Sequence, residues 1–150
     1  MKNYWIMKNE YSDYSIDDFK KDKKTMWDGV RNYQARNFIR EMKSGDEFIY
    51  FHSNGDPSGA AGLGKIVSNP YPDPSQFKKG KYYEKRATKD NPVWTTVDVR
   101  FEKKFDNLVP LTDIKKSDKL KGILVARKGN RLSVTPISKS HFDEILKMSK

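Results

Sequence analysis

One stretch of the sequence combines side chains that stack on flat ligands with side chains that hydrogen-bond to them. Residues 27–37 read WDGVRNYQARN, with a tryptophan, a tyrosine, two arginines and three amides but little aliphatic bulk. A segment that only packs into a core would repeat Leu, Ile or Val at regular spacing. The composition of this stretch instead predicts the wall of a ligand site, where aromatic faces and polar groups lie side by side.

A second stretch has the composition of a phosphate-binding surface. Residues 78–89, KKGKYYEKRATK, contain six basic residues and one acid, with two tyrosines among them. Lysine and arginine release counterions from a nucleic-acid backbone, and tyrosine rings can stack on bases. We therefore predict backbone contacts here, while a merely solvated lysine-rich loop stays the alternative. The predicted contacts are Lys78, Lys79, Lys81, Lys85 and Arg86.

Residues that carry covalent or metal chemistry are sparse. The chain has no cysteine and only two histidines, His52 and His141, which gives no metal-ligand cluster. His52 and Ser53 are neighbours on a predicted strand, so their side chains point to opposite faces and do not form a nucleophile and base pair. The run from Gly59 to Lys65 resembles a phosphate-binding loop, but Ile66 replaces the hydroxyl residue that would hold magnesium. We therefore predict ligand binding without catalysis, metal or cofactor.

The composition predicts one folded domain over residues 1–150. Charged residues make up 33% of the chain, but 13% aromatic residues can build a core and argue against disorder. The net charge is +10, most of it in the second half. No run approaches the roughly 18 apolar residues of a membrane span, and the first residues lack the apolar region of a secretory signal. We expect an intracellular protein, cytoplasmic or, in a eukaryote, nuclear, with no membrane partner.

Periodicity and capping signals predict the elements that must position these residues. Strands are predicted over residues 3–8, 47–53, 59–67, 93–105 and 131–137. Helices are predicted over residues 14–21, 32–42, 111–118 and 138–148, with Ser15 and Thr112 as N-caps. Residues 68–92 form a long irregular loop. This order predicts an α+β fold, a curled sheet or partly open barrel of about five to six strands with short helices around it.

Two of the predicted strands carry further information. Glycines recur in residues 59–67, which indicates a strand that another backbone or a ligand approaches closely. Residues 93–105 alternate with a period of two, so Val97 and Val99 are expected on the core face and Trp94 and Asp98 on the other face.

Seven motifs resemble, in the same order, those of the EVE domain family across nearly the whole chain. They read YWIMKNE, YSIDDF, WDGVRNYQARNFIREMKSGD, HSN, YPDP, WTTVDVRF and RLSVTPI. The resemblance implies a PUA-like open β-barrel related to the YTH domain, with a pocket that holds a modified nucleobase. It also gives the first stretch a role as a wall of that pocket.

The resemblance implies which residues form the pocket. Trp27 would be one wall, with Asn32 and Tyr33 close by, while Trp94 matches the family's other characteristic tryptophan and Asp98 follows it. Polar residues that end two strands would form one rim: Lys8, Asn9, Glu10, Ser53 and Asn54. The chain departs from the family at this rim. Asn9 and Tyr11 stand where many members have Ser and Pro, so the preferred modification need not match that of the family.

These assignments have structural alternatives. Trp27 and Trp94 could be core side chains, although their polar neighbours favour the pocket. Asn32, Ser53 and Asn54 could cap a helix or form a turn.

Together the observations predict a non-enzymatic module that recognises a modified base, such as a modified cytosine, in DNA or RNA. Aromatic walls would sandwich a flipped or unpaired base, while amides and Asp98 would read its polar edge. Asp98 could equally pair with Arg100 alone, or act as a general base. Two other functions stay open: an enzyme that acts on RNA or nucleotides, and a protein-interaction module.

Overall fold

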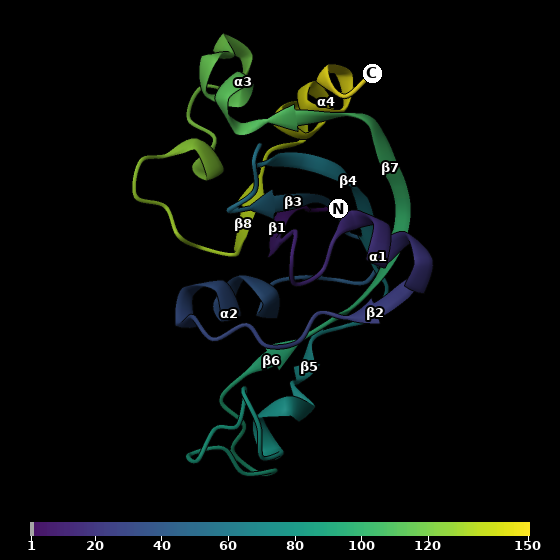
Figure 1. The fold of residues 1–150 in the computed structure, drawn as a ribbon. Helices are drawn as coiled ribbons and strands as arrows, with labels where there is room; N and C mark the ends of the chain where they lie inside the picture. The colour runs from purple at the N-terminus through teal and green to yellow at the C-terminus, as the bar shows by residue number, and fades with distance from the viewer. Residues whose placement is uncertain (1) are drawn as a thin grey trace.

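A six-stranded mixed sheet, in the order β2-β7-β4-β3-β1-β8, curls into half a barrel in the computed structural model, which describes residues 2–150 (Figure 1). Its strands are β1 (Tyr4–Glu10), β2 (Lys24–Met26), β3 (Glu47–Ser53), β4 (Gly59–Ile66), β7 (Asp98–Pro110) and β8 (Val134–Ile137). Strands β1 and β3 run parallel, and the other neighbours run antiparallel. A small second sheet pairs β5 (Tyr71–Pro72) with β6 (Thr95–Thr96). The predicted α+β open barrel is confirmed.

Short helices surround the sheet. They are α1 (Ile16–Asp22), α2 (Tyr33–Arg40), α3 (Leu111–Lys116) and α4 (Lys139–Met148), with 3-10 turns η1 (Pro74–Phe77), η2 (Asp118–Leu120) and η3 (Leu124–Ala126). Ser15 caps α1 in the predicted capping box with Asp18. The predicted Thr112 cap is wrong, because β7 runs directly into α3 at Pro110 and leaves no residue between them to cap the helix. Within residues 2–150, no helix is long and apolar enough to cross a membrane.

The central strand β3 divides the core into two clusters. Phe48 and Tyr50 belong to one cluster, whereas Ile49 and Phe51 belong to the other. This division follows from the alternation of side chains along a strand whose two faces are both covered. Trp27 packs in the cluster of Phe48 and Tyr50.

The glycines of β4 make room for close neighbours. A Cβ atom at Gly59 would collide with the carbonyl oxygen of Val109, and one at Gly64 would collide with the ring of Phe48. Both glycines lie in a strand that pairs on its two edges, with β3 and with β7. The prediction of a strand that another backbone approaches closely is confirmed, and this geometry is not that of a phosphate-binding loop.

The predicted strand over residues 93–105 divides into β6 and β7. Val97 and Val99 are fully buried, as predicted. Trp94 and Thr96 are buried as well, against the expected alternation. The reason is that the long loop folds over this segment: Gln76 is fully buried there, and its side-chain oxygen accepts a hydrogen bond from the Trp94 amide (2.8 Å).

Candidate nucleic-acid interface

A small polar cleft of about 210 Å³ opens where β1 and β2 end. We call it the Trp27 cleft. Its lining residues are Asn9, Asp13, Tyr14, Thr25, Met26, Trp27, Asp28 and Tyr82. The lining combines aromatic rings, a thioether, an amide and two carboxylates, and it contains no lysine or arginine. Such a lining suits a flat, uncharged ligand with hydrogen-bond donors at its edge.

Trp27 belongs to the core and to this cleft at once. Its ring is 5% exposed and meets the rings of Phe48 and Tyr50 edge-on, at centroid distances of 5.8 and 5.5 Å. Its amide donates to the Val97 carbonyl (2.9 Å), and its carbonyl accepts from the Thr96 hydroxyl (2.6 Å). The residue is therefore held by its ring and by its backbone, and only a small part of the ring is left for a ligand.

Tyr82 reaches the cleft from the basic segment of the long loop. Its ring lies directly on Gly29, where an added Cβ atom would come within 2.6 Å of the ring. Gly29 also has a positive φ of +81°, a conformation that favours glycine. The Arg31 guanidinium lies 5.2 Å from the Tyr82 ring centre and donates to the Tyr82 carbonyl (2.7 Å). The composition of residues 78–89 indicates tyrosines that could stack on bases, but no local pattern distinguishes the ring of Tyr82 from that of Tyr83.

Arg31 braces the two segments that meet at the cleft. Besides Tyr82, it donates to the buried Asp73 carboxylate (3.2 Å) and to the Ser75 hydroxyl (3.0 Å). Asp73 also accepts a hydrogen bond from the Gly29 amide (2.8 Å). Burial opposes the ionisation of Asp73, but the hydrogen bonds from Ser75, Gly29 and Arg31 outweigh it and lower the pKa of this carboxyl. The ion pair between Arg31 and Asp73, with its hydrogen bonds, therefore connects the cleft wall to the long loop.

Asp28 lines the same cleft and follows Trp27 in the chain. Partial burial raises the pKa of Asp28, and the nearby Asp73 carboxylate raises it further. A carboxyl group in this position can accept a hydrogen bond from the amino group of a base such as cytosine.

Trp94 lies elsewhere and does not line the Trp27 cleft. It is 4% exposed because the Tyr33 ring stacks on it, with centroids 4.9 Å apart and planes 24° from parallel. The Arg36 guanidinium covers Tyr33 at 4.8 Å. The indole N–H donates to Glu84 (3.0 Å), and Arg86 donates to the Tyr33 hydroxyl (2.7 Å). This stack fastens the basic loop to α2.

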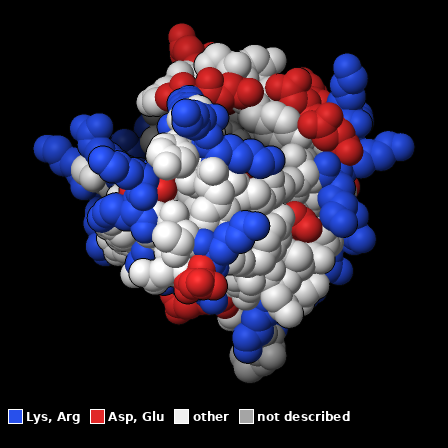
Figure 2. Space-filling view, turned by 90° about the horizontal axis from the view of Figure 1, so that it is seen from below, with Lys and Arg blue, Asp and Glu red and all other residues white. Residues whose placement is uncertain are grey.

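Glu84 also accepts a hydrogen bond from the Arg86 guanidinium (3.1 Å). The hydrogen bonds from Arg86 and then from the Trp94 indole lower the pKa of Glu84 to about 2. Arg86 is thus engaged within the protein. The other four predicted backbone contacts, Lys78, Lys79, Lys81 and Lys85, are exposed and form no salt bridge within residues 2–150. Figure 2 views the molecule from the end that carries this loop, and it shows Lys and Arg side chains spread over this face with groups of Asp and Glu between them.

A second hollow of about 600 Å³ lies next to the Trp27 cleft, because Asn9 and Asp13 line both. We call it the rim groove. It brings together the five polar residues expected at the strand ends: Lys8, Asn9, Glu10, Ser53 and Asn54. The parallel pairing of β1 with β3 sets Glu10 beside Ser53, and the Asn54 amide donates to Glu10 (2.7 Å). The remaining lining residues are Asp13, Gly129, Asn130, Arg131 and Ser133.

Asn32 and Asp98 line neither hollow. The Asn32 side chain accepts from the Ala35 amide (3.0 Å) and caps α2, which is the structural role considered for it. Asp98 accepts a hydrogen bond from the Tyr71 hydroxyl (2.6 Å) rather than from Arg100. Burial, and then this carboxylate, raise the pKa of Tyr71.

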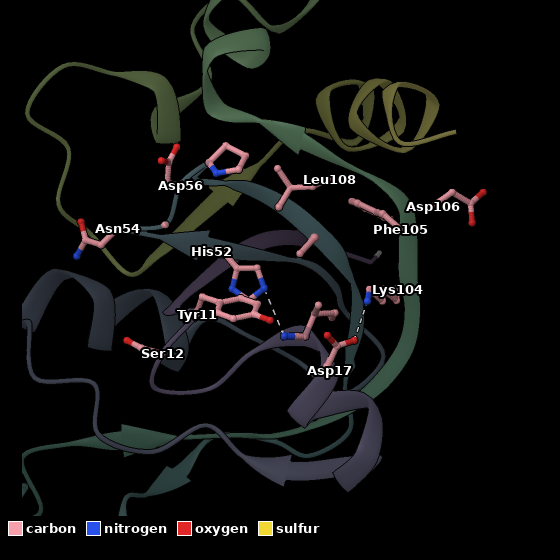
Figure 3. A pocket seen from close by; sticks show the side chains of 14 residues that line it. Tyr11, Ser12, Asp17, His52, Asn54, Asp56, Lys104, Phe105, Asp106 and Leu108 are labelled. Atoms are coloured by element: carbon pink, nitrogen blue, oxygen red, sulfur yellow. Dashed lines mark hydrogen bonds and ion pairs between the residues drawn. The ribbon is translucent and has the colours of Figure 1, made fainter.

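A third pocket, of about 530 Å³, is formed largely by β7 and by the loop that follows β3, with smaller contributions from α1 and from His52 at the end of β3 (Figure 3). Ile16, Phe105 and Leu108 contribute its apolar surface. Its polar groups are partly engaged: Nε2 of His52 accepts from the Ile16 amide (3.4 Å), and Lys104 pairs with Asp17 (2.8 Å). Burial lowers the pKa of His52, which is 3% exposed. Among residues 2–150, no three His, Asp or Glu side chains gather as a metal site.

Comparisons with known proteins identify the family. The EVE domain model matches residues 3–148. Human thymocyte nuclear protein 1 is 39% identical over an alignment that covers all of this chain and 75% of that protein. A Pseudomonas syringae crystal structure is 40% identical, with a TM-score of 0.93 over 98% of this chain and 99% of that chain. The human THYN1 protein, crystallised in complex with DNA that contains 5-methylcytosine, is 38% identical, with a TM-score of 0.91 over 99% and 98% of the two chains.

The family match extends from before β1 to the end of α4, so it includes the Trp27 cleft, the rim groove and the basic loop. The strong structural likeness covers the same span. The chain belongs to the EVE domain family.

Proposed function

We propose that the protein recognises a modified cytosine in DNA, and that the base enters the Trp27 cleft after it leaves the base stack. The observation that carries the proposal is the position of Tyr82: one residue of the basic loop is also a wall of the cleft. Phosphate contacts and a base pocket therefore meet at one point. The complex of the related human THYN1 protein with 5-methylcytosine-containing DNA supports this choice of ligand.

The chemistry of the cleft suits cytosine. Asp28 and Asp13 can accept hydrogen bonds from the exocyclic amino group, which thymine and uracil lack. Tyr82 offers a stacking surface, and Met26 and Trp27 offer apolar contacts to a methyl group. Burial of one methyl group contributes about 0.8 kcal/mol, or about fourfold in Kd.

The test is a binding screen at one fixed salt concentration. Labelled oligonucleotides of one sequence, with cytosine or 5-methylcytosine at a central position, are titrated by fluorescence anisotropy as single strands and duplexes, in DNA and in RNA. We expect about fourfold tighter binding of the methylated DNA. Equal dissociation constants for methylated and plain strands would contradict the proposal, and a preference confined to RNA would correct the ligand class.

Asp28→Asn tests the reading of the amino group. An amide can no longer act purely as an acceptor, so discrimination between cytosine and thymine at the central position should fall by roughly 1–3 kcal/mol. Asp17→Asn is the matched control, because Asp17 lines the third pocket. Unchanged discrimination in the Asp28 variant would remove this residue from the reading edge.

We also propose that recognition proceeds without turnover. The lining of the Trp27 cleft contains no histidine, serine or lysine, and its two carboxylates, Asp13 and Asp28, have no histidine beside them and no cluster of metal ligands within residues 2–150 to activate a water or a hydroxyl. Incubation of the bound oligonucleotides with and without divalent metal, followed by mass spectrometry, checks this point, and any new product would support the enzyme alternative. A nucleic-acid ligand implies an intracellular site of action, and several relatives bear the name thymocyte nuclear protein.

A further inference from the structure

The positive charge of the chain is concentrated in two segments rather than one. The loop over residues 78–92 has six basic residues and two acids, and residues 111–131 have seven basic residues and two acids. The sequence alone indicates only the first segment as a basic surface, because its charges lie close together in one loop. The charges of the second segment are spread over α3, η2, η3 and the turn that follows them. Figure 1 shows the two segments apart, above and below α2.

The two segments each border one of two neighbouring hollows. Tyr82 of the first segment lines the Trp27 cleft, and Arg131 of the second lines the rim groove. The two hollows are neighbours, because Asn9 and Asp13 line both of them.

The end of the second segment is a built turn, which we call the 127–131 turn. The Asn130 side chain donates to the Leu124 carbonyl (2.6 Å) and accepts from the Leu132 amide (2.8 Å). The Lys8 amide donates to the Ser133 carbonyl (2.8 Å), which attaches the turn to β1. A turn fixed in this way presents its side chains at a set position beside the groove.

The basic side chains of this turn are available for a ligand. Arg127, Lys128 and Arg131 are all exposed. Within residues 2–150, none of the three forms a salt bridge or a side-chain hydrogen bond. Unpaired cations gain most from a phosphodiester backbone, since they release its counterions without breaking an internal pair.

We propose that the 127–131 turn is a second backbone-binding site, which holds the phosphates on one side of the recognised base while residues 78–89 hold those on the other side. This inference rests on the proposed function in one respect, that the base lies in the Trp27 cleft. The strand then runs from the loop, across the cleft and along the rim groove to the turn.

The experiment compares two charge-removal variants with a control. One variant combines Arg127→Gln, Lys128→Gln and Arg131→Gln; the other combines Lys78→Gln, Lys79→Gln and Lys85→Gln. The control combines Lys43→Gln, Lys147→Gln and Lys150→Gln, exposed positions that line neither hollow. Each protein is titrated over a range of salt with single-stranded DNA whose 5-methylcytosine lies at the centre, near the 5′ end or near the 3′ end.

The slope of log affinity against log salt is negative, and each phosphate contact on a single strand adds roughly 0.7 to its magnitude. Removal of three phosphate-binding charges should therefore lower the magnitude of this slope by about 2. We expect this decrease in both variants with the central base. With a terminal base, each variant should show a weaker salt dependence on only one of the two oligonucleotides. If the loop variant shows it on the oligonucleotide modified near one end, the turn variant should show it on the oligonucleotide modified near the other end. The inference is overturned if the turn variant matches the control, or if the slope falls in both variants on the same oligonucleotide with a terminal base.

Failure of the proposed function would give a different result. If the proposed function is wrong, the wild-type protein binds methylated and plain strands with equal affinity. The inference about the turn is tested by a different measurement, namely on which oligonucleotides the salt dependence of each variant decreases. A turn variant whose slope falls for every oligonucleotide, wherever the modified base lies, would also refute the inference, because it would show a backbone contact that is not ordered by the cleft.

Discussion

Tyr82 is the residue whose removal tests base stacking in the cleft most directly. Its ring is half-buried, belongs to neither core cluster and stands on the backbone of Gly29. Stacking of a base on an aromatic ring contributes roughly 1–3 kcal/mol. Tyr82→Ala should therefore raise the Kd for a methylated oligonucleotide by roughly 5- to 150-fold.

The same change should leave the fold intact. Inside the protein, the substitution chiefly removes the cation–π interaction between the Tyr82 ring and Arg31 at 5.2 Å, worth about 0.5–1 kcal/mol at an exposed site. For a chain of this size, 1 kcal/mol corresponds to about 2–4 °C in Tm. A large decrease in affinity with a fall in Tm of at most a few degrees is thus the expected outcome.

Tyr83 provides the matched control, because it is the next residue in the same loop and is 51% exposed. Tyr83→Ala removes an identical side chain without altering the lining of the cleft. Fluorescence anisotropy with methylated and plain oligonucleotides, together with thermal unfolding, gives both quantities for each variant. The reasoning fails if affinity falls equally in the two variants, or if Tyr82→Ala binds like the wild type.

Three further substitutions test other parts of the structure. Gly29→Ala should displace the Tyr82 ring, which lies 2.6 Å from the new Cβ position, and weaken binding with no change in charge; unaltered affinity would contradict this. Trp27→Ala removes a buried ring and should cost about 3–5 kcal/mol, a fall in Tm of roughly 6–20 °C; a shift under about 3 °C would show that the ring is not structural. Burial lowers the pKa of His52 in the folded protein, so as the pH falls the unfolded chain takes up the proton at a higher pH than the folded protein does. The contribution of His52 to stability is therefore full above about pH 6.5 and declines as the pH falls toward the folded pKa. The decline is at most about 1.4 kcal/mol per pH unit. Urea unfolding across this range should show His52→Gln flattening the decline, with His141→Gln as control.

Most elements could be predicted from the sequence because their signals are local. The Ser15 box that begins α1 and the aromatic strand over residues 47–53 each depend on neighbours within a few residues, and so does the Asn32 cap of α2, which the sequence offered only as the alternative to a pocket role. The Thr112 prediction failed for a reason of the same kind: a capping residue must precede the helix, and β7 continues to its first turn. The curled sheet itself followed from the resemblance and from the order of these elements.

Family resemblance and composition identified the groups of residues that could form the site, namely an aromatic wall, polar strand ends and a basic loop. The tertiary structure decided which of them meet. Trp27 and Trp94 have polar neighbours of similar kind in the sequence, yet one ring borders the cleft and the other lies under Tyr33. The position of Tyr82 depends on Gly29 and Arg31, more than 50 residues earlier in the chain. No local pattern encodes such an arrangement, because the packing of the whole loop against the sheet brings the partners together.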